Sequence, residues 1–454
     1  MRQPLPRARL AGTSSLVLLQ PTPLCNLDCR YCYLPSRGLA RVMSYQVADA
    51  VAETVDAWSR HHPVTVLWHG GEPLTAGVSR LGGLLDRFPP GREHPVRHAV
   101  QTNATLIDEA WCRLFMERRI KVSVSVDGPG PGSARLDRGG RDSTDRALRG
   151  IGLLKDHGIA FGAIAVVSDP SPRKAADLHR WFATLGCRVL GVNLVERKGV
   201  NLTEREGVHP MGPEDVNLTG PEGVNPTGPK GVNLTEREGV NGRTVRADEN
   251  HENAENADVG KDDDVAGFWS TLAACGRADR RMALRDVEHA WRYVRAELAG
   301  AAGRWADQPV DPLPMVTWDG QMVALSPDLA GFSSDRHGPF TVGDVRTSGL
   351  AGCLARAGET PWVAEALAGV DACRAVCDLF AYCRGGQAAN KYFETGRLDA
   401  TETVFCRNSR KLLMEGVIRD AERVAEEARS RGAYPVAGRG PGSPGRGGGL
   451  RGVR

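Results

Sequence analysis

The chain of 454 residues is long enough for two or three domains and a large core, which excludes a peptide or a small disulfide-stapled scaffold. Its 58 Lys and Arg nearly balance its 55 Asp and Glu, so composition offers no electrostatic case for a nucleic-acid or membrane-surface partner. The first thirty residues lack the apolar core of an export signal, and no apolar run is long enough to span a bilayer. We therefore expect a cytoplasmic protein with no membrane and no nucleic-acid partner.

Between residues 15 and 194, short runs rich in Val, Ile and Leu alternate with stretches patterned like helices. The runs lack polar alternation, as expected for strands covered on both faces. Repeated strand–helix units predict an α/β fold with a parallel sheet, and six of them predict a partial, open (β/α)6 barrel of the TIM-like kind. Chemistry in such a sheet sits at the C-terminal strand ends. The expected strands are Leu16–Gln20, Val64–Trp68, Val96–Gln101, Ile120–Val126, Ile159–Val167 and Val189–Leu194.

An octapeptide repeat follows the expected barrel, in seven units that begin at residue 191 and recur every eight residues. A fixed period usually indicates a solenoid, but these units hold too few apolar residues for a stacked core. We interpret residues 191–264, which end in an acidic stretch, as a disordered insertion. The repeat contains no Phe, Trp or Tyr, so it cannot itself be the target of a reaction that crosslinks an aromatic side chain. Before the barrel lies a short segment, 1–14; after the insertion come a second domain, 265–430, and a Gly/Pro/Arg-rich tail, 431–454, expected to be disordered.

Three of the eleven cysteines lie close together in the loop after the first expected strand. Cys25, Cys29 and Cys32 have the spacing C-x3-C-x2-C. Three thiolates on one tight loop can hold three irons of a 4Fe-4S cube and leave the fourth iron open to another ligand. Structural zinc normally takes four protein ligands, and no fourth Cys or His lies nearby. Zinc and inert thiols are the alternatives to a cluster.

This spacing, with Tyr31 before the last cysteine, resembles the signature of the radical S-adenosylmethionine (SAM) superfamily. The resemblance implies that the open iron binds the amino and carboxylate groups of SAM, and that Tyr31 belongs to the cofactor site. Electron transfer into SAM then yields a 5′-deoxyadenosyl radical that abstracts hydrogen from a substrate.

The loop after the second expected strand reads His-Gly-Gly-Glu-Pro and resembles the loop that meets the methionine amine in that superfamily. By this resemblance Gly70 and Gly71 permit close backbone approach, and Glu72 contacts SAM. Asn103 and Ser125, at the ends of the next two strands, resemble polar groups that face the ribose or carboxylate of SAM. Ordinary turn formers are the alternative for Asn103 and Ser125.

A second group of four cysteines can saturate another 4Fe-4S cluster or hold tetrahedral zinc, so spacing alone does not choose. Considered together with the first motif, the segment that holds these four cysteines resembles the SPASM domain, which is the auxiliary-cluster extension of peptide-modifying radical SAM enzymes. It departs from the full seven-cysteine pattern, because Gln387 and Ser326 stand where cysteines would be. We therefore expect one auxiliary 4Fe-4S cluster and two clusters in total. The four cysteines are Cys373, Cys377, Cys383 and Cys406.

The segments LLQPTPLCNLDCRYCYLP, HGGEPL and CRAVCDLFAYCRGGQAANKYFETGRLDATETVFC resemble the cyclophane-forming radical SAM peptide maturases. Those enzymes join an aromatic ring carbon to an unactivated side-chain carbon in a ribosomally made precursor peptide. The resemblance implies a precursor peptide as substrate and a ferredoxin- or flavodoxin-type electron donor. This reaction also needs a general base that accepts a proton from the aromatic ring. Asp328 is a candidate for this base because of its position in the sequence, and an ordinary acidic residue at a strand end is the alternative.

Two other function classes stay open. One is a radical SAM peptide maturase that makes a thioether, an oxidised side chain or an epimer. The other is a non-catalytic iron–sulfur redox protein that has kept the fold.

Overall fold

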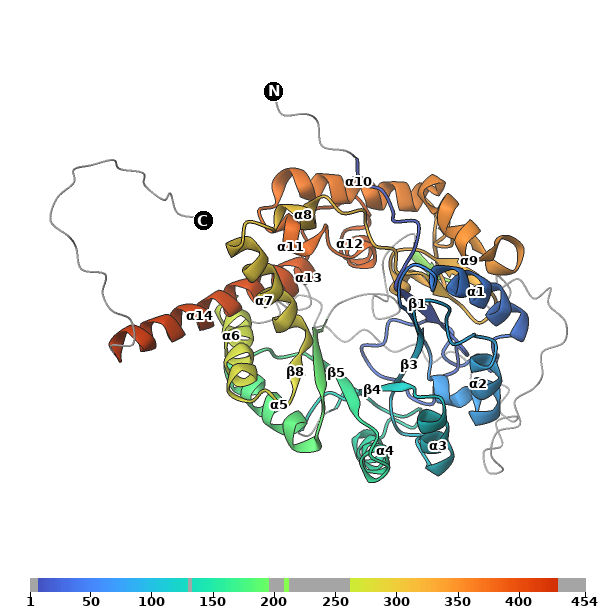
Figure 1. Ribbon diagram of the computed structural model, residues 1–454, viewed down its shortest axis with the longest axis horizontal. Coiled ribbons are helices and arrows are strands. Elements are labelled where there is room, and N and C mark those ends of the chain that lie inside the picture. The colour runs from blue at the N-terminus through green and yellow to red at the C-terminus, as the bar shows by residue number, and fades with distance from the viewer. Residues whose placement is uncertain (1–6, 130–132, 196–207, 212–261, 432–454) are drawn as a thin grey trace, which may run out of the picture.

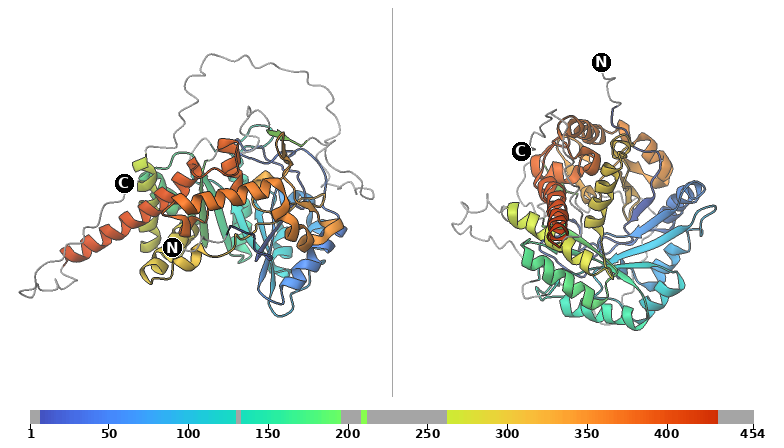
Figure 2. Two further views of the ribbon diagram at one scale, coloured as in Figure 1. Left: turned by 90° about the horizontal axis from the view of Figure 1, so that it is seen from above. Right: turned by 60° about the vertical axis from the view of Figure 1, so that its left-hand side comes forward.

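The computed structural model describes residues 7–129, 133–195, 208–211 and 262–431. The strands curve around the centre of the molecule, helices α1 to α5 lie outside them, and the C-terminal helices occupy the remaining side (Figures 1 and 2). This is an α/β fold whose parallel sheet forms an open barrel joined to a C-terminal domain.

Six consecutive parallel strands form the centre of the sheet, and the order β1 to β6 follows the chain. All six expected strands are confirmed within one or two residues at each end. The apolar runs form strands because they are buried on both faces by the barrel interior and by the outer helices. The strands are β1 (Leu16–Leu19), β2 (Val64–Trp68), β3 (Val96–Thr102), β4 (Lys121–Ser125), β5 (Phe161–Val167) and β6 (Val189–Leu194).

Short strands at both edges extend this sheet to ten strands. On one side β9 pairs in parallel with β1, and β10 and β13 continue the sheet antiparallel; on the other side β8 pairs in parallel with β6. Elements of two or three residues carry no usable periodicity, so they form only because longer neighbours offer a free edge. They are β8 (Ala283–Leu284), β9 (Met315–Val316), β10 (Gln321–Val323) and β13 (Gly343–Asp344).

Helices follow the barrel strands as the pattern predicts. Ser44, Asp108 and Ser171 cap the starts of α1, α3 and α5 with side-chain oxygens that accept backbone N–H groups. Gly186 ends α5 in the left-handed conformation that glycine tolerates. The barrel helices are α1 (Tyr45–Trp58), η1 (Pro73–Ala76), α2 (Val78–Leu85), α3 (Glu109–Glu117), α4 (Thr144–Asp156) and α5 (Pro172–Leu185).

The C-terminal part is mainly helical and shares one hydrophobic core with the barrel. Trp269 and Trp362 from this part are as fully buried as Trp68 and Phe115 from the barrel. The far end of α14 projects from the body (Figure 2). The helices are α6 (Asp262–Ala278), α7 (Arg285–Leu298), α8 (Gly303–Ala306), η4 (Pro327–Leu329), α9 (Val345–Arg356), η5 (Ala357–Glu359), α10 (Pro361–Val376), α11 (Phe380–Cys383), α12 (Ala388–Thr395), α13 (Val404–Cys406), η6 (Arg407–Lys411) and α14 (Leu412–Ser430).

Most of the octapeptide repeat, the first residues and the tail after 431 lie outside the described residues. Within the repeat, β7 (Val208–Pro210) pairs antiparallel with β11 (Phe332–Ser334), which also pairs with β12 (Gly338–Pro339). Helix α6 begins at Asp262, three residues before the expected boundary, because three aspartates occupy its first turn, where negative charge is favourable. The end of the acidic stretch is therefore helix and not linker.

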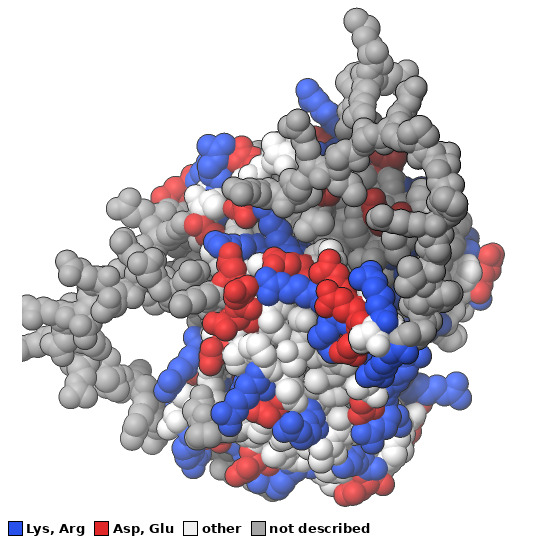
Figure 3. Space-filling view, turned by 90° about the vertical axis from the view of Figure 1, so that its left-hand side faces the viewer, with Lys and Arg blue, Asp and Glu red and all other residues white. Residues whose placement is uncertain are grey.

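Lys and Arg side chains alternate with Asp and Glu over the face that Figure 3 shows. Many Lys and Arg side chains of the described chain form ion pairs, and one such pair joins Arg419 to Glu415 along α14. No helix in the described ranges has the length and apolar character needed to cross a membrane.

A half-buried histidine on β3 is expected to make the stability of the barrel depend on pH. The indole Nε1 of Trp68 donates to Nδ1 of His98 at 3.3 Å, so the imidazole accepts there and is neutral. Burial, with a smaller contribution from Arg118, lowers the pKa of His98 from 6.5 to about 4. Because the unfolded chain binds a proton at this histidine more readily than the folded chain does, the free energy of unfolding is highest above pH 6.5. It falls by about 3 kcal/mol at most as the pH falls towards 4.

We therefore expect His98→Gln to lose part of this pH dependence. The free energy of unfolding, measured in urea, should fall more steeply between pH 7 and 4 for the parent than for the variant. His61→Gln, which changes an exposed histidine, serves as the control and should keep the slope of the parent. If the free energy of unfolding depends on pH equally in all three proteins, His98 is not the source of this pH dependence.

Candidate active site

The three-cysteine loop leaves the end of β1 and is held by hydrogen bonds to other parts of the chain. The backbone N–H of Cys25 donates to the Arg37 carbonyl at 3.0 Å, and Cys32 N–H donates to the Cys29 carbonyl at 3.0 Å. The guanidinium of Arg138 donates to the Cys25 carbonyl at 2.8 and 3.0 Å. All three thiols are half-buried and unpaired, so the loop presents them without a disulfide.

The Gly-Gly-Glu loop after β2 lies directly against the cysteine loop. Gly71 has φ of +61°, and a Cβ built there would lie 2.6 Å from the carbonyl oxygens of Thr22 and Pro23. Gly70, with φ of +93°, packs against Met315 and Gln20. Only glycine fits Gly71, because any side chain would push the cysteine loop away.

Glu72 is 1 % exposed, and its carboxylate faces the end of β3 and the first turn of η1. It accepts hydrogen bonds from the Thr102 hydroxyl at 2.7 Å, from Asn103 N–H at 2.7 Å and from Leu74 N–H at 3.1 Å. Burial raises its pKa to about 7, although these hydrogen bonds favour the ionised form. A buried carboxyl of this kind is suited to an ammonium ligand, which would supply the missing positive charge.

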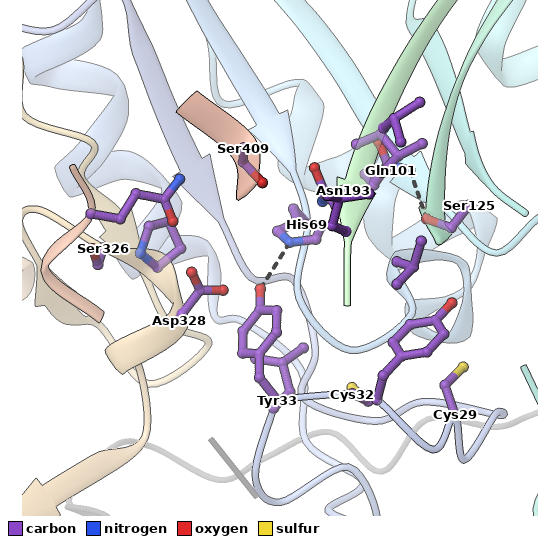
Figure 4. Close-up of a pocket in the computed structure, with 18 of the residues that line it drawn as sticks. Cys29, Cys32, Tyr33, His69, Gln101, Ser125, Asn193, Ser326, Asp328 and Ser409 are labelled. Atoms are coloured by element: carbon purple, nitrogen blue, oxygen red, sulfur yellow. Dashed lines mark hydrogen bonds between the residues drawn. The ribbon is translucent and has the colours of Figure 1, made fainter. Parts of the chain in front are cut away.

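Asn103 and Ser125 lie at neighbouring strand ends, as predicted. The amide of Asn103 donates to Asn26 Oδ1 at 2.8 Å, so Asn103 holds the cysteine loop from the side of β3. The Ser125 hydroxyl accepts from Gln101 Nε2 at 2.7 Å (Figure 4). Gln101 itself also faces the cavity and was not singled out from the sequence, although its position at the end of β3 follows the same rule.

The aromatic ring of Tyr31 is part of a buried polar network. Its hydroxyl donates to Asp127 Oδ2 at 2.6 Å, and Arg135 Nε donates to Asp127 Oδ1 at 3.0 Å. The Arg135 guanidinium lies 5.3 Å from the centre of the Tyr31 ring. Arg135 was not predicted from the sequence, because an arginine in an irregular segment carries no local signal. Its buried positive charge acts on Cys29, whose thiol it helps to ionise.

One cavity of about 520 Å³ joins these groups to the C-terminal domain. Cys25, Cys29 and Cys32 line it, as do five of the six predicted cofactor-binding residues; Gly70 does not. Asn193 at the end of β6 and Ser326, Gln387 and Arg410 from the C-terminal domain complete the wall. The predicted cofactor-binding residues that line the cavity are Tyr31, Gly71, Glu72, Asn103 and Ser125.

The candidate base Asp328 lines the same cavity, opposite the strand ends (Figure 4). Burial, the negative charge of Asp328 and a hydrogen bond with it raise the pKa of Tyr33 well above its ordinary value. The Tyr33 hydroxyl also lies 3.3 Å from His69 Nε2. Burial lowers the pKa of His69, against the opposing charge of Asp328. The carboxylate therefore has two polar neighbours that can hold or pass on a proton.

The chemistry of the three-cysteine loop fits a cationic metal cluster. Burial, followed by the charge of Glu72, raises the pKa of Cys25 to about 12, and burial raises that of Cys29 to about 11. The same cause raises the pKa of Cys32. Three thiolates in this setting need a positively charged ligand, and a coordinated thiol is deprotonated outright. Soft sulfur donors of this kind fit a 4Fe-4S cluster.

The four C-terminal cysteines converge from separate elements, and none of them lines the cavity. Cys373 lies in α10, Cys377 ends that helix, and Cys383 and Cys406 end α11 and α13. A hydrogen bond between Cys383 and Cys406 lowers the pKa of Cys383 to about 6 and raises that of Cys406. Cys373 interacts electrostatically with Cys377 and Cys383.

Comparison with known proteins identifies the barrel. Residues 19–181 match the model of the radical SAM superfamily. This part of the chain is a radical SAM domain. It contains all three cysteines of the first group and the Gly-Gly-Glu loop.

Relatives and solved structures extend the likeness beyond the radical SAM domain. An uncharacterised protein of Synechocystis sp. is 27% identical over 90% of this chain and 92% of its own length. The serine-type anaerobic sulfatase-maturating enzyme of Klebsiella aerogenes is 34% identical over 187 residues, which are 38% of this chain and 45% of that enzyme. The alignment thus spans less than half of the sulfatase-maturating relative. The structure of anSMEcpe with bound AdoMet and the Cp18Cys peptide superposes with a TM-score of 0.61 at 18% identity, covering 91% of this chain and 99% of that one.

The contact between Gly71 and the cysteine loop yields a direct test. Gly71→Ala places a methyl group against the carbonyls of residues 22–24, so we expect the loop to shift and the chain to lose iron after anaerobic reconstitution. The control is Gly158→Ala, at a similar φ of +68° but with no atom within 4 Å of the added Cβ. Both variants carry the backbone strain, and only Gly71→Ala carries the clash. Equal iron content in the two variants would refute this explanation of Gly71.

Proposed function

We propose that this chain is a radical SAM enzyme that joins an aromatic ring carbon to an aliphatic side-chain carbon in a ribosomally made precursor peptide. The observation that carries the proposal is the shared cavity, which has the three-cysteine loop on one wall and residues of the C-terminal domain on the other. A peptide segment held there is in reach of both halves of the chain. The amino-acid sequences of the segments that contain the cysteines favour the cyclophane-forming maturases among enzymes of this kind.

In this proposal Cys25, Cys29 and Cys32 hold a 4Fe-4S cluster, and Glu72 receives the amino group of SAM. Tyr31, Gly71, Asn103 and Ser125 line the rest of the SAM site. When bound, cluster and SAM supply a 5′-deoxyadenosyl radical that removes one hydrogen atom from the substrate. The protein orients the reactants and excludes water through a largely buried cavity wall.

Formation of the new bond removes a second hydrogen from the aromatic ring, as a proton and an electron. Asp328 is our candidate acceptor for the proton, with Tyr33 and His69 beside it. The four C-terminal cysteines would hold an auxiliary 4Fe-4S cluster on the C-terminal side of the cavity. This cluster is our candidate acceptor for the electron. A ferredoxin- or flavodoxin-type protein is the expected electron donor to the first cluster.

For the first group, the lack of a fourth Cys or His nearby in the sequence favours an iron–sulfur cluster over zinc. A structural zinc ion needs four such ligands around a single centre, whereas each ligand of a cube binds a different iron.

A second candidate is maturation of a sulfatase or a similar protein by oxidation of one side chain. The partial likeness to the serine-type sulfatase-maturating enzyme and the fold shared with anSMEcpe favour it. The two candidates differ in product: oxidation changes a single residue, whereas a cyclophane joins two. Tandem mass spectrometry and NMR distinguish them when a candidate precursor peptide with an aromatic residue and a sulfatase-derived peptide with Ser or Cys are each treated anaerobically with enzyme and SAM. A ring-carbon to side-chain bond supports our proposal, and an oxidised Ser or Cys supports the alternative.

Iron analysis tests the cluster assignment. We expect about eight irons per reconstituted parent chain and about four in a Cys25→Ala, Cys29→Ala, Cys32→Ala triple variant. The triple variant should also form no 5′-deoxyadenosine. Cys275→Ala, at a half-buried cysteine outside both groups, is the control and should match the parent. About four irons in the parent and none in the triple variant would refute the auxiliary cluster.

The role of Asp328 is tested by Asp328→Asn. Loss of the proton acceptor should lower the rate of crosslinked product roughly 10²- to 10⁴-fold, while 5′-deoxyadenosine still forms. Asp307→Asn, at an exposed aspartate after α8 that does not line the cavity, should leave both rates unchanged. If product and 5′-deoxyadenosine fall together in Asp328→Asn, Asp328 acts in SAM binding and not as the base.

A further inference from the structure

A buried lysine contacts the C-terminal cysteines. Lys391, in α12, is 3% exposed, and its ammonium donates to the Gly369 carbonyl at 3.0 Å and to Cys373 Sγ at 3.5 Å. A buried ammonium is unfavourable unless an anion or several hydrogen bonds compensate it. Within the described part of the chain its partners are a carbonyl and a thiol, with no carboxylate. Cys373 as a thiolate would therefore supply the balancing negative charge.

The backbone leaves room for this ammonium. A Cβ on Gly369 would lie 2.9 Å from Lys391 Nζ and 2.5 Å from the Leu398 carbonyl oxygen. Glycine at 369 thus lets α10 pass close enough for its carbonyl to accept from the lysine. The contact between Lys391 and Cys373 is built into the packing of α10 against α12.

A second cation connects the cysteines to the cavity. Arg410 lies in η6, a π-helix that begins directly after Cys406 and whose wider turn is often found at functional sites. Its guanidinium donates to the Ser409 carbonyl at 2.9 Å and lies 5.0 Å from the centre of the Phe405 ring. Arg410 lines the cavity and also interacts electrostatically with Cys383. No carboxylate among the described residues pairs with it.

A third nearby cation is balanced. Lys411 Nζ pairs with Glu402 at 2.8 Å near the surface, where the lysine side chain is 40% exposed. Of these three cations, whose charges act on Cys373, Cys383 and Cys406, Lys391 and Arg410 have no carboxylate partner among the described residues.

We propose that Lys391 and Arg410 raise the reduction potential of the iron–sulfur cluster held by the four C-terminal cysteines, so that it accepts an electron released in the cavity. The inference rests on the proposed function, because it requires a cluster at these cysteines. Reduction adds one negative charge to the cluster, and nearby positive charge and hydrogen bonds to its sulfurs stabilise the reduced form. The electrons balance: the peptide loses one electron as its ring proton goes to the base, and the cluster gains that electron.

The test is a redox titration followed by EPR spectroscopy on the full-length, reconstituted triple variant that lacks Cys25, Cys29 and Cys32, where only the C-terminal cluster remains. In this background Lys391→Met and Arg410→Met should each lower the equilibrium constant for one-electron reduction about tenfold, a shift of about 59 mV to lower potential. Arg410→Lys keeps the charge and should restore most of the potential. A double variant, Glu402→Gln with Lys411→Gln, removes two balanced charges near the same cysteines and should leave the potential unchanged.

Each outcome decides the proposal. If Lys391→Met and Arg410→Met bind about four irons and keep the potential of their parent, the proposal is wrong, while the cluster itself stands. Arg410→Met decides the matter alone if Lys391→Met does not fold, because Arg410 lies on the cavity wall and not in the core. If the parent triple variant binds no iron, the auxiliary cluster of the proposed function fails, and this inference fails with it.

Discussion

The carboxylate of Glu72 joins the parts of the radical SAM domain that must stay together. It accepts hydrogen bonds from residues at the end of β3 and from the first turn of η1, while its own backbone N–H donates to the Leu24 carbonyl in the cysteine loop. Because Glu72 is buried, each of these contacts is shielded from water and costs much free energy to break. The Gly-Gly segment before it brings the two loops into direct contact. The cysteines are therefore positioned by the ends of β2 and β3 as much as by their own loop.

One large hydrophobic core runs through the barrel and the C-terminal domain, so the cavity between them has fixed walls. The short strands β8 and β9 add to this connection, because each continues the barrel sheet with residues that follow the repeat in the chain. This construction explains how Asp328 and Arg410, far from the first cysteines in sequence, face the same space. The charges of the cavity are consequently divided, with Glu72 and Arg135 on the barrel side and Arg285, Asp286, Asp328 and Arg410 on the other.

Sequence analysis predicted the six central strands and the position of Asp328 at the cavity, because long buried strands and strand-end loops leave strong local patterns. It did not predict the edge strands β8 and β13, whose two residues form only against existing neighbours. It also missed Arg135 and Lys391, since their importance lies in contacts with Asp127 and Cys373 that are distant in sequence. The metal-ligating and cofactor-binding roles stay predictions, because proximity in the fold does not by itself identify the group that is bound.

The position of the repeat explains why the fold accommodates it. The repeat begins in β6, whose end contributes Asn193 to the cavity, and the described chain resumes at Asp262 in α6. Lengthening a connection costs little, because loop-closure entropy grows only with the logarithm of its length. Both ends of the connection are anchored independently, β6 by pairing with β5 and β8, and α6 by burial of Phe268 and Trp269. A change in the number of repeat units would therefore act at the strand-end edge of the barrel, where the cavity lies, and leave the core intact.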